Sequence, residues 1–492
     1  MAGAIAIVGL GPGDPNLLTR SAWECLAGAS QVYLRTSFHP GLAGLPAGPT
    51  YHSLDDCYEA HDTAAEVYRD IAQRVVTLAA HGEDVVYAVP GDPSIGEATV
   101  PQILALADEA QIPVQVHAGI SFVAPVCRAL GIDPLDGLQI ADGTLLAQRI
   151  HPPLDPDVAV LVAQVYNRNV AAEVKLTLLA LYAEQQPVTI VRHAGLEDQS
   201  LREIALFELD RQDDLDHLTS LYLPPLARPG SLSSYQELVG RLRAPDGCPW
   251  DRAQTHESLR SSLLEETYEV LGALDSGDPE ELCEELGDLL LQVLFHASLA
   301  TEHGDFRLID SVSHAIDKLV RRHPHVFSDA VAEDAETVLL NWEQIKRQER
   351  GDKESEFRSM LASINNALPA LAQALDVQQR VARVGFDWPS REDVLAKVQE
   401  ELHELSMAEG SAQQEAELGD VLFSLVNLAR WYHVDPESAL RQANSRFRAR
   451  FGWMEAEAHR AGTPLEQLSL QEMDDLWERA KDEFEASSAE GE

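Results

Sequence analysis

The feature that most constrains the fold of this chain is a pattern of acidic residues on two adjacent helices. Residues 265–288 read EETYEVLGALDSGDPEELCEELGD. On a helix, Glu265 and Glu269 lie one turn apart on one face, and Glu285 and Asp288 are neighbours at i, i+3. A Ser-Gly-Asp-Pro break between these pairs allows two antiparallel helices. Such a hairpin can direct four or five carboxylates at one point.

Apolar residues surround the second acidic pair at helical spacing: Leu286, Leu289, Leu290, Val293 and Leu294. The two acids therefore lie on or beside a face that favours burial, although a solvated acidic helix face is the alternative. Buried like charges repel one another unless a cation lies between them. All-oxygen ligation favours Mg²⁺ or Mn²⁺. The candidate metal ligands here are Glu265, Glu266, Glu269, Glu285 and Asp288.

The chain repeats this pattern further on, where ELGDVLFSLVNLA echoes ELGDLLLQVLFHA. The second set of candidate metal ligands is Glu400, Glu401, Glu404, Glu417 and Asp420. Basic residues at i, i+4 and a tryptophan follow each set in the same order: Lys318, Arg322 and Trp342, then Arg446, Arg450 and Trp477. Since a solvated charge run has no reason to recur in this way, we interpret the two stretches as repeats.

These stretches, with the strings GCPWD, RRHPHVF, NWEQIK and VGFDW, resemble the MazG family of nucleoside triphosphate pyrophosphohydrolases over roughly residues 230–485. The resemblance implies Mg²⁺-dependent hydrolysis of a nucleoside triphosphate to a monophosphate and diphosphate. It implies catalytic roles for Glu266, Glu269, Glu401 and Glu404, and it favours the second copy as the active one. For nucleotide binding, we expect Lys318, Arg322, Arg446 and Arg450 to pair with phosphates and Trp342 or Trp477 to stack on the base, unless the tryptophans are core residues.

The first half of the chain has a different pattern. Apolar runs at residues 2–9, 84–93 and 114–121 each pass into a loop of small residues, and a further strand is expected at 31–34. This order predicts a parallel sheet with a ligand cleft at the carboxyl edge. The first loop is not a dinucleotide site, because Pro12 removes a backbone donor where a pyrophosphate would bind.

The loop sequences GLGPGDP, PGDP and GIS together resemble the tetrapyrrole methylase family of S-adenosylmethionine-dependent methyltransferases, over about residues 3–224. This resemblance implies that Pro12 and Asp14 lie near the substrate. It implies that Gly91, Asp92, Ser94, Gly119 and Ser121 lie near S-adenosylmethionine.

Composition limits the partners and the location. The formal net charge of -44 argues against a nucleic-acid partner, because phosphates would be repelled. No apolar run reaches the roughly 18 residues of a membrane-spanning helix, and the N-terminus lacks a signal sequence. Five scattered cysteines show no paired spacing, so we expect them to be reduced. We expect a cytoplasmic protein.

The fold class that follows is multidomain: an α/β tetrapyrrole-methylase-like domain followed by two all-α repeats of MazG type. The predicted boundaries are 1–224 for the first domain, 225–234 for a linker rich in Pro, Gly and Ser, 235–352 and 353–486 for the repeats, and 487–492 for a disordered tail. Helical carboxylate bundles often complete their core by dimerisation, so we expect a homodimer.

Two other functions stay open. The methyltransferase could be the main activity, acting on a tetrapyrrole-type small molecule, with the helical half regulatory or oligomerising. Alternatively, the helical half could be a non-enzymatic oligomerisation module whose carboxylates only add solubility. In addition, His256 with the CPWD string could form a lid or base pocket, or the string could be a packed helix entry.

Overall fold

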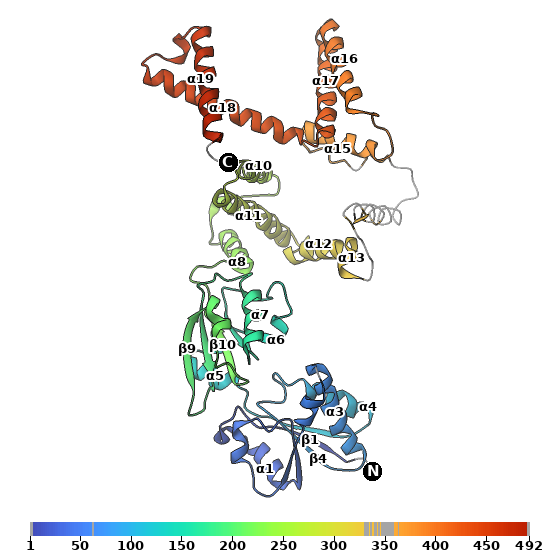
Figure 1. Ribbon diagram of the computed structural model, residues 1–492, viewed down its shortest axis with the longest axis vertical. Coiled ribbons are helices and arrows are strands. Elements are labelled where there is room, and N and C mark those ends of the chain that lie inside the picture. The colour runs from blue at the N-terminus through green and yellow to red at the C-terminus, as the bar shows by residue number, and fades with distance from the viewer. Residues whose placement is uncertain are drawn as a thin grey trace. The chain divides into compact units, whose positions relative to one another are not determined.

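The computed structural model describes residues 3–61, 63–328, 359–362 and 364–489, with the single positions 334, 337, 338, 342 and 345. The chain divides into two compact units, residues 1–254 and 255–492. In Figure 1 the first is coloured blue to green and the second yellow to red. Within the described residues, all strands belong to the first unit, and no helix combines the length and apolar character needed to cross a membrane.

The first sheet is entirely parallel, with strand order β3-β2-β4-β1-β5. In that order the strands are Thr50–Ser53, Gln31–Leu34, Val85–Val89, Ile5–Gly9 and Val114–His117. The helices of this part are α1 (Arg20–Gly28), α2 (Asp56–Ala60), α3 (Ala64–Ala80) and α4 (Thr99–Glu109). Ile5 and Ile7 of β1 pack in the core with α3 and α4, whereas Val8 packs on the opposite face with α1. The sheet is therefore buried on both faces, as parallel sheets usually are.

The second sheet is mixed, with strand order β6-β7-β10-β8-β9. In that order the strands are Leu138–Asp142, Ala159–Ala163, Thr219–Leu223, Pro187–Arg192 and Ser200–Ala205. Only β6 and β7 pair in parallel. Helix α5 (Val123–Leu130) packs on Leu161 and Val191 of this sheet. Helices α6 (Gly143–Leu146) and α7 (Arg168–Leu178) pack against its other hydrophobic cluster.

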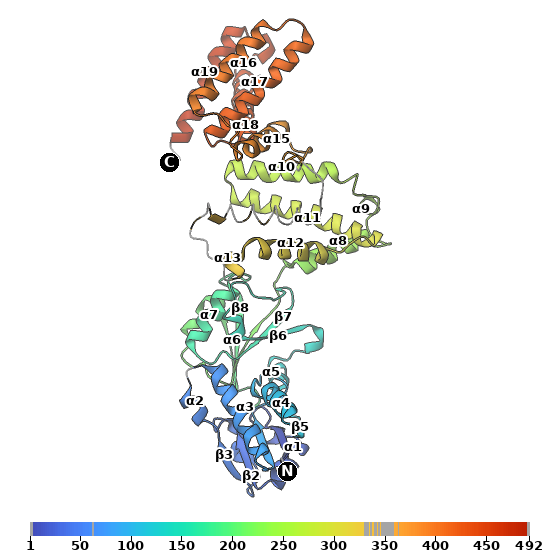
Figure 2. The ribbon, with the colours of Figure 1, turned by 90° about the vertical axis from the view of Figure 1, so that its right-hand side faces the viewer.

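Helices α8 (Leu232–Arg243) and α9 (Pro249–Arg252) close the first unit. The second unit contains two long helical hairpins. The first hairpin is α10 (Arg260–Ser276) with α11 (Pro279–His303), and Figure 2 shows the two helices side by side. The second hairpin is α16 (Arg391–Met407) with α17 (Ser411–Trp431). The remaining described helices of this unit are α12 (Leu308–Arg322), α13 (Pro324–Phe327), α15 (Ala370–Ala382), α18 (Pro436–Arg460) and α19 (Leu470–Ala489).

Two predicted boundaries fall within helices. The tail predicted to be disordered from residue 487 begins inside α19, which continues to Ala489. The predicted linker, 225–234, ends inside α8, which begins at Leu232 because Ser231 caps it by accepting a hydrogen bond from the Ser234 N–H. Helical periodicity in the sequence also predicts a helix at 337–350, a range that lies outside the described residues except at positions 337, 338, 342 and 345.

Candidate active site

The turn of the first hairpin positions its carboxylates. Gly277 ends α10 in the left-handed conformation, at φ +73°, which glycine adopts without a steric penalty. Asp278 then caps α11, accepting hydrogen bonds from the N–H groups of Glu280 and Glu281, and Pro279 occupies the first turn. This tight connection returns α11 along α10, so that acidic residues of the two helices face one another.

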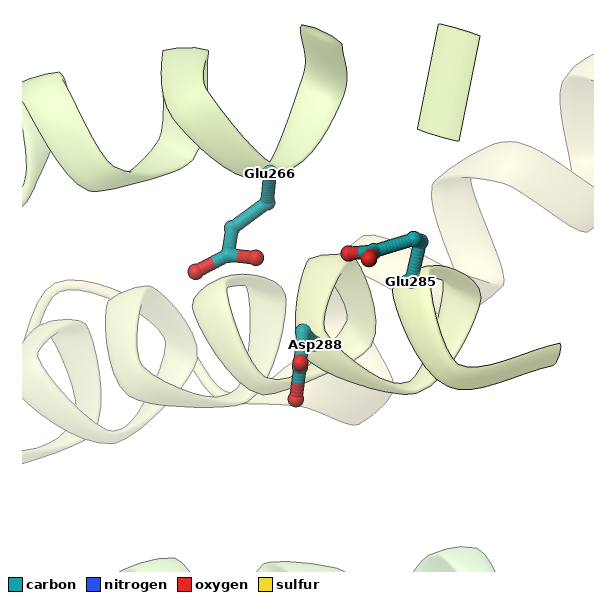
Figure 3. A group of neighbouring side chains, drawn as sticks. All are labelled: Glu266, Glu285 and Asp288. Atoms are coloured by element: carbon teal, nitrogen blue, oxygen red, sulfur yellow. The ribbon is translucent and has the colours of Figure 1, made fainter. Parts of the chain in front are cut away.

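The structure brings together Glu266 of α10 with Glu285 and Asp288 of α11, and we name these three residues the first cluster (Figure 3). One carboxylate oxygen from each lies within 4.8 Å of the others. Such an arrangement of oxygens from two helices can hold a divalent cation. Neighbouring Gln292, one turn beyond Asp288 and buried, donates a hydrogen bond of 3.4 Å to Glu266.

Mutual repulsion is visible in the electrostatics of the first cluster. Burial, followed by the charges of Asp288 and Glu269, raises the pKa of Glu266. Burial and the charges of Glu269 and Asp288 likewise raise the pKa of Glu285. Both shifts mean that the carboxylates bind protons more tightly than usual, as crowded anions do. They also place Glu269 beside the cluster, although it is not one of the three residues whose oxygens converge.

The second hairpin gathers an equivalent set, Glu401 of α16 with Glu417 and Asp420 of α17, which we name the second cluster. Its oxygens also lie within 4.8 Å of one another. Glu401 is buried, and the Lys397 ammonium donates to it at 2.8 Å and to Glu400 at 2.9 Å. The two hairpins therefore share the carboxylate geometry but differ in this lysine.

Four of the ten predicted metal ligands lie outside the two clusters: Glu265, Glu269, Glu400 and Glu404. Each has an exposed side chain. Glu400 instead accepts a hydrogen bond from Lys397. The helical period explains the selection, because Glu265 and Glu266 point about 100° apart around α10 and only one of them can face α11.

The predicted nucleotide-binding residues form an arginine–tryptophan pair after each hairpin. The Arg322 guanidinium carbon lies 5.7 Å from the centre of the Trp342 ring, and that of Arg450 lies 6.0 Å from the Trp477 ring. Trp477 also packs on Phe447, with ring centres 5.0 Å apart. Lys318 and Arg446, one turn before each arginine, are exposed. Each tryptophan thus contacts an arginine and is not enclosed in apolar core alone.

A histidine pair links the segment before α10 to α11. His256 and His296 stack with ring centres 5.1 Å apart, and their Nδ1 atoms share a hydrogen bond of 2.8 Å. His296 lies one turn beyond Gln292 on α11. The CPWD string pointed to His256, whereas no motif of the sequence pointed to Gln292, His296 or Lys397. Helical spacing could have identified them, because each lies four residues, or about one turn, from a residue of the site: Gln292 from Asp288, His296 from Gln292, and Lys397 from Glu401.

In the first unit, a cleft of about 130 Å³ opens between the two sheets. Pro12 and Gly91 line it, together with Arg35, His39 and His193. The other residues predicted to lie near the substrate or the cofactor do not line this cleft: Asp14, Asp92, Ser94, Gly119 and Ser121. Asp14 caps a short 3-10 helix by accepting from the Asn16 N–H. Ser121 accepts from the Val123 N–H at the start of α5.

Three glycines bring the loops at the edge of the first sheet together. A Cβ atom at Gly119 would lie 2.0 Å from the Gly91 carbonyl oxygen, and one at Gly9 would lie 2.6 Å from the Gly119 nitrogen. Asp92 ties the same loops together by accepting from the N–H groups of Gly119, at 3.0 Å, and Ser94, at 2.9 Å. Asp92 and Gly119 therefore shape the backbone around the cleft.

Opposite these loops, His193 lies between two carboxylates. Its Nδ1 atom lies 2.5 Å from Asp198 and its Nε2 atom 2.7 Å from Asp216. Burial opposes protonation, but the hydrogen bonds to Asp216 and Asp198 outweigh it and raise the pKa of His193. The cleft thus has, on this side, a histidine whose protonation is favoured by two carboxylates and which is held in place from both ring nitrogens.

Two family models match the chain. The one described as tetrapyrrole (corrin/porphyrin) methylases matches residues 4–210. The one described as the MazG nucleotide pyrophosphohydrolase domain matches residues 254–327, which include the whole first cluster.

Several relatives agree with these matches. "Uncharacterized protein YabN" of Bacillus subtilis is 42% identical over 492 residues, covering 98% of this chain and 99% of that protein. "Nucleoside triphosphate pyrophosphohydrolase/pyrophosphatase MazG" of Thermotoga maritima is 46% identical over 250 residues, covering 50% of this chain and 95% of that protein. The Escherichia coli K12 nucleoside triphosphate pyrophosphohydrolase is 43% identical over 250 residues, covering 50% of this chain and 94% of that protein.

Among solved structures, uroporphyrin-III-C-methyltransferase of Thermus thermophilus is 21% identical and covers 45% of this chain and 94% of that chain, with a TM-score of 0.37.

The fold and the site define a two-part chain in which a methylase-type α/β unit precedes helical hairpins that gather carboxylates. The chain belongs to the MazG nucleotide pyrophosphohydrolase family and carries a tetrapyrrole methylase domain in its first half.

Proposed function

We propose that the helical half of this chain hydrolyses nucleoside triphosphates to monophosphates and diphosphate, with divalent cations bound at the two clusters. The observation that carries the proposal is the recurrence of one glutamate facing a Glu-x-x-Asp pair across each helical hairpin. In the first cluster, the residues fit a cation well. Their oxygens converge, and the raised pKa values of Glu266 and Glu285 reflect repulsion that a bound cation would relieve.

The chain's own residues supply the remaining steps. A bound Mg²⁺ or Mn²⁺ would neutralise polyphosphate charge and lower the pKa of water. The bond between the α and β phosphoryl groups breaks, and the proton of the attacking water passes to a carboxylate that is not fully committed to the cation. Glu269 and Glu404 suit this role, because each lies one helical turn from a cluster glutamate without belonging to the converging set.

The basic residues bind the leaving diphosphate and the tryptophans hold the base. Arg322 and Arg450 pair with phosphate oxygens, helped by Lys318 and Arg446 one turn earlier on the same helices. The contact of each arginine with Trp342 or Trp477 supports a site in which phosphate and base recognition are adjacent. Such a site would accept a nucleoside triphosphate.

Release of diphosphate from a panel of the eight common NTPs and dNTPs with Mg²⁺ tests this proposal. Wild type, Asp288→Asn and Asp420→Asn are compared side by side. Activity that one substitution abolishes supports the proposal and identifies the working cluster, which we expect to be the second. Activity that survives the double substitution would contradict it. As a matched control, Glu455→Gln removes an exposed carboxylate on α18, which belongs to neither cluster, and it should leave diphosphate release unchanged.

For the first unit, we propose S-adenosylmethionine binding at the cleft, with Gly91 and the loop held by Asp92 closest to the cofactor and Pro12 near the methyl acceptor. Isothermal titration with S-adenosylhomocysteine tests this assignment. The alternative function, in which methyl transfer is the main activity and the helical half is regulatory, gains support only if the diphosphate assay fails and a methyl acceptor is found.

We also propose a cytoplasmic homodimer. Helix α12 carries a row of exposed apolar residues at helical spacing: Ile309, Val312, Ile316 and Leu319. A row of this kind favours burial against a second helix surface. Light scattering after gel filtration should give twice the mass of 54.0 kDa, and Ile316→Glu should reduce it to the monomer mass. A monomeric wild type would overturn this assignment.

A further inference from the structure

The two clusters differ by one positive charge. In the second hairpin, Lys397 lies three residues before Glu400 and donates to both Glu400 and Glu401. In the first hairpin, the residue three positions before Glu265 is Ser262, which carries no charge. Across the described part of the chain, no lysine or arginine forms an ion pair with a residue of the first cluster, so only the second cluster has a built-in counter-ion.

Burial makes this counter-ion significant. Glu401 is 6% exposed, and within the described ranges its carboxylate forms an ion pair only with the Lys397 ammonium, at 2.8 Å. A divalent cation arriving at Glu401, Glu417 and Asp420 must displace this ammonium or bind beside it. Either event weakens cation binding, because like charges a few ångströms apart repel strongly where water is partly excluded.

Lys397 can also move. Its side chain is 31% exposed, and a lysine has a flexible four-carbon stem ending in a charge that pairs well with phosphate. Arrival of a triphosphate would therefore give the ammonium new anionic partners while freeing Glu401. The first cluster has no residue that requires such an exchange.

We propose that Lys397 is the resident counter-ion of the second cluster and makes divalent-cation binding there dependent on a nucleotide's phosphates, whereas the first cluster binds the cation without nucleotide. This inference rests on the proposed function, in which both clusters are cation sites. Lys397 is thereby a positioning residue, which acts on the reaction through Glu401.

Mn²⁺ binding to the full-length protein without nucleotide tests this directly, by electron paramagnetic resonance of the free ion. Asp420→Asn disrupts the second cluster, so it reports cation binding at the first cluster. Asp288→Asn disrupts the first cluster, so it reports cation binding at the second cluster. We expect Asp420→Asn to bind Mn²⁺ roughly tenfold more tightly than Asp288→Asn. Adding Lys397→Met to Asp288→Asn should strengthen binding by roughly tenfold, whereas Lys397→Arg, which keeps the charge, should not. Arg20→Gln is the control, since it removes an exposed i, i+4 ion pair in the first unit.

The outcomes separate this inference from the proposed function. Equal Mn²⁺ affinities of Asp288→Asn and Asp420→Asn would overturn the role of Lys397, whether or not Lys397→Met folds. The role of Lys397 would also be overturned if adding Lys397→Met to Asp288→Asn left the Mn²⁺ affinity unchanged while the helical circular dichroism signal was retained. In both cases the two clusters would still be cation sites. If even the wild type binds no Mn²⁺ at either cluster, the proposed function fails as well.

Discussion

The Asp157 carboxylate accepts a hydrogen bond of 2.9 Å from the backbone N–H of Ser231. It also accepts from the Gly230 N–H at 2.9 Å and from the Ser234 hydroxyl. These donors lie at the start of α8, within the segment whose composition predicts a linker. The contacts fix that segment to the α/β unit, so α8 begins at a defined place.

Replacing Asp157 should release this segment. We expect Asp157→Ala to cost about 1 kcal/mol of stability in the first unit, because two partly buried donors, at Ser231 and Ser234, and the exposed Gly230 N–H lose their acceptor. Limited proteolysis with mass spectrometry should then find new cleavage near residues 225–234. Asp213→Ala, which removes only an exposed ion pair with Arg168, is the matched control and should not change the cleavage pattern. Identical digestion of Asp157→Ala and wild type would contradict the anchoring role.

The same contacts make the anchor sensitive to acid. Burial opposes ionisation, but the hydrogen bonds from Ser234, Ser231 and Gly230 prevail and lower the pKa of Asp157 to about 2. A lowered carboxyl pKa contributes stability above its unfolded value, which is lost as the pH falls toward 2. The stability difference between wild type and Asp157→Ala, measured by urea unfolding, should therefore shrink between about pH 4 and pH 2. A difference that is constant over this range would rule this mechanism out.

The crowded carboxylates of the first cluster predict the opposite pH dependence in metal-free protein. Because the pKa values of Glu266 and Glu285 are raised, folding is favoured by protonation, and stability falls as the pH rises through these values. We expect the metal-free helical unit to melt at a lower temperature at pH 7 than near pH 4.5, the ordinary glutamate pKa. This decrease in melting temperature should be smaller in Glu266→Gln than in wild type. Differential scanning calorimetry in EDTA measures this. Mg²⁺ should raise the melting temperature of wild type at pH 7, and a Glu455→Gln control should behave as wild type.

The histidine held between two aspartates should stabilise the first unit mainly when protonated. Since the pKa of His193 is raised, its contribution is complete below its unfolded value and is lost as the pH rises through the folded value. His193→Asn keeps a residue that tolerates the observed φ of +52° but removes the charge. Urea unfolding should show a loss of about 1–3 kcal/mol at pH 5.5 and a smaller loss at pH 9. The control His151→Gln, which changes an exposed histidine, should lose no stability at either pH. Equal losses of stability for His193→Asn at pH 5.5 and pH 9 would be evidence against this account.

The glycine contacts at the cleft predict a steric effect. Gly119→Ala places a methyl group 2.0 Å from the Gly91 carbonyl, so the two loops must separate. We expect a loss of about 1–3 kcal/mol, as for other overpacked sites, and weaker S-adenosylhomocysteine binding by calorimetry. Gly48→Ala is the control, since its Cβ meets no atom within 4 Å. Normal stability of Gly119→Ala would show that the loops do not need this close approach.

Local sequence patterns predicted most of the elements. The 3.6-residue periodicity of the sequence predicts helices at 412–432 and 436–460, and α17 and α18 occupy these ranges, because periodicity and caps are local signals. The strands expected at 31–34 and 114–121 correspond to β2 and to β5 with its loop, in a parallel sheet. Glu285 with Asp288 and Glu417 with Asp420 were identifiable as pairs, because helical spacing alone fixes which of these residues are neighbours.

The selection among adjacent acids required the tertiary structure. Glu266, and not Glu265, meets α11, since the rotation of α10 about its axis is set by packing along its whole length. Gly119 meets Gly91 across two loops, and Asp157 meets Ser231 across 74 residues of sequence. The sequence by itself determined the repeated hairpins and their acidic faces, because these follow from 3.6-residue periodicity and turn residues. Only the tertiary structure decided which oxygens converge and which segments are anchored, because those contacts depend on how distant elements pack.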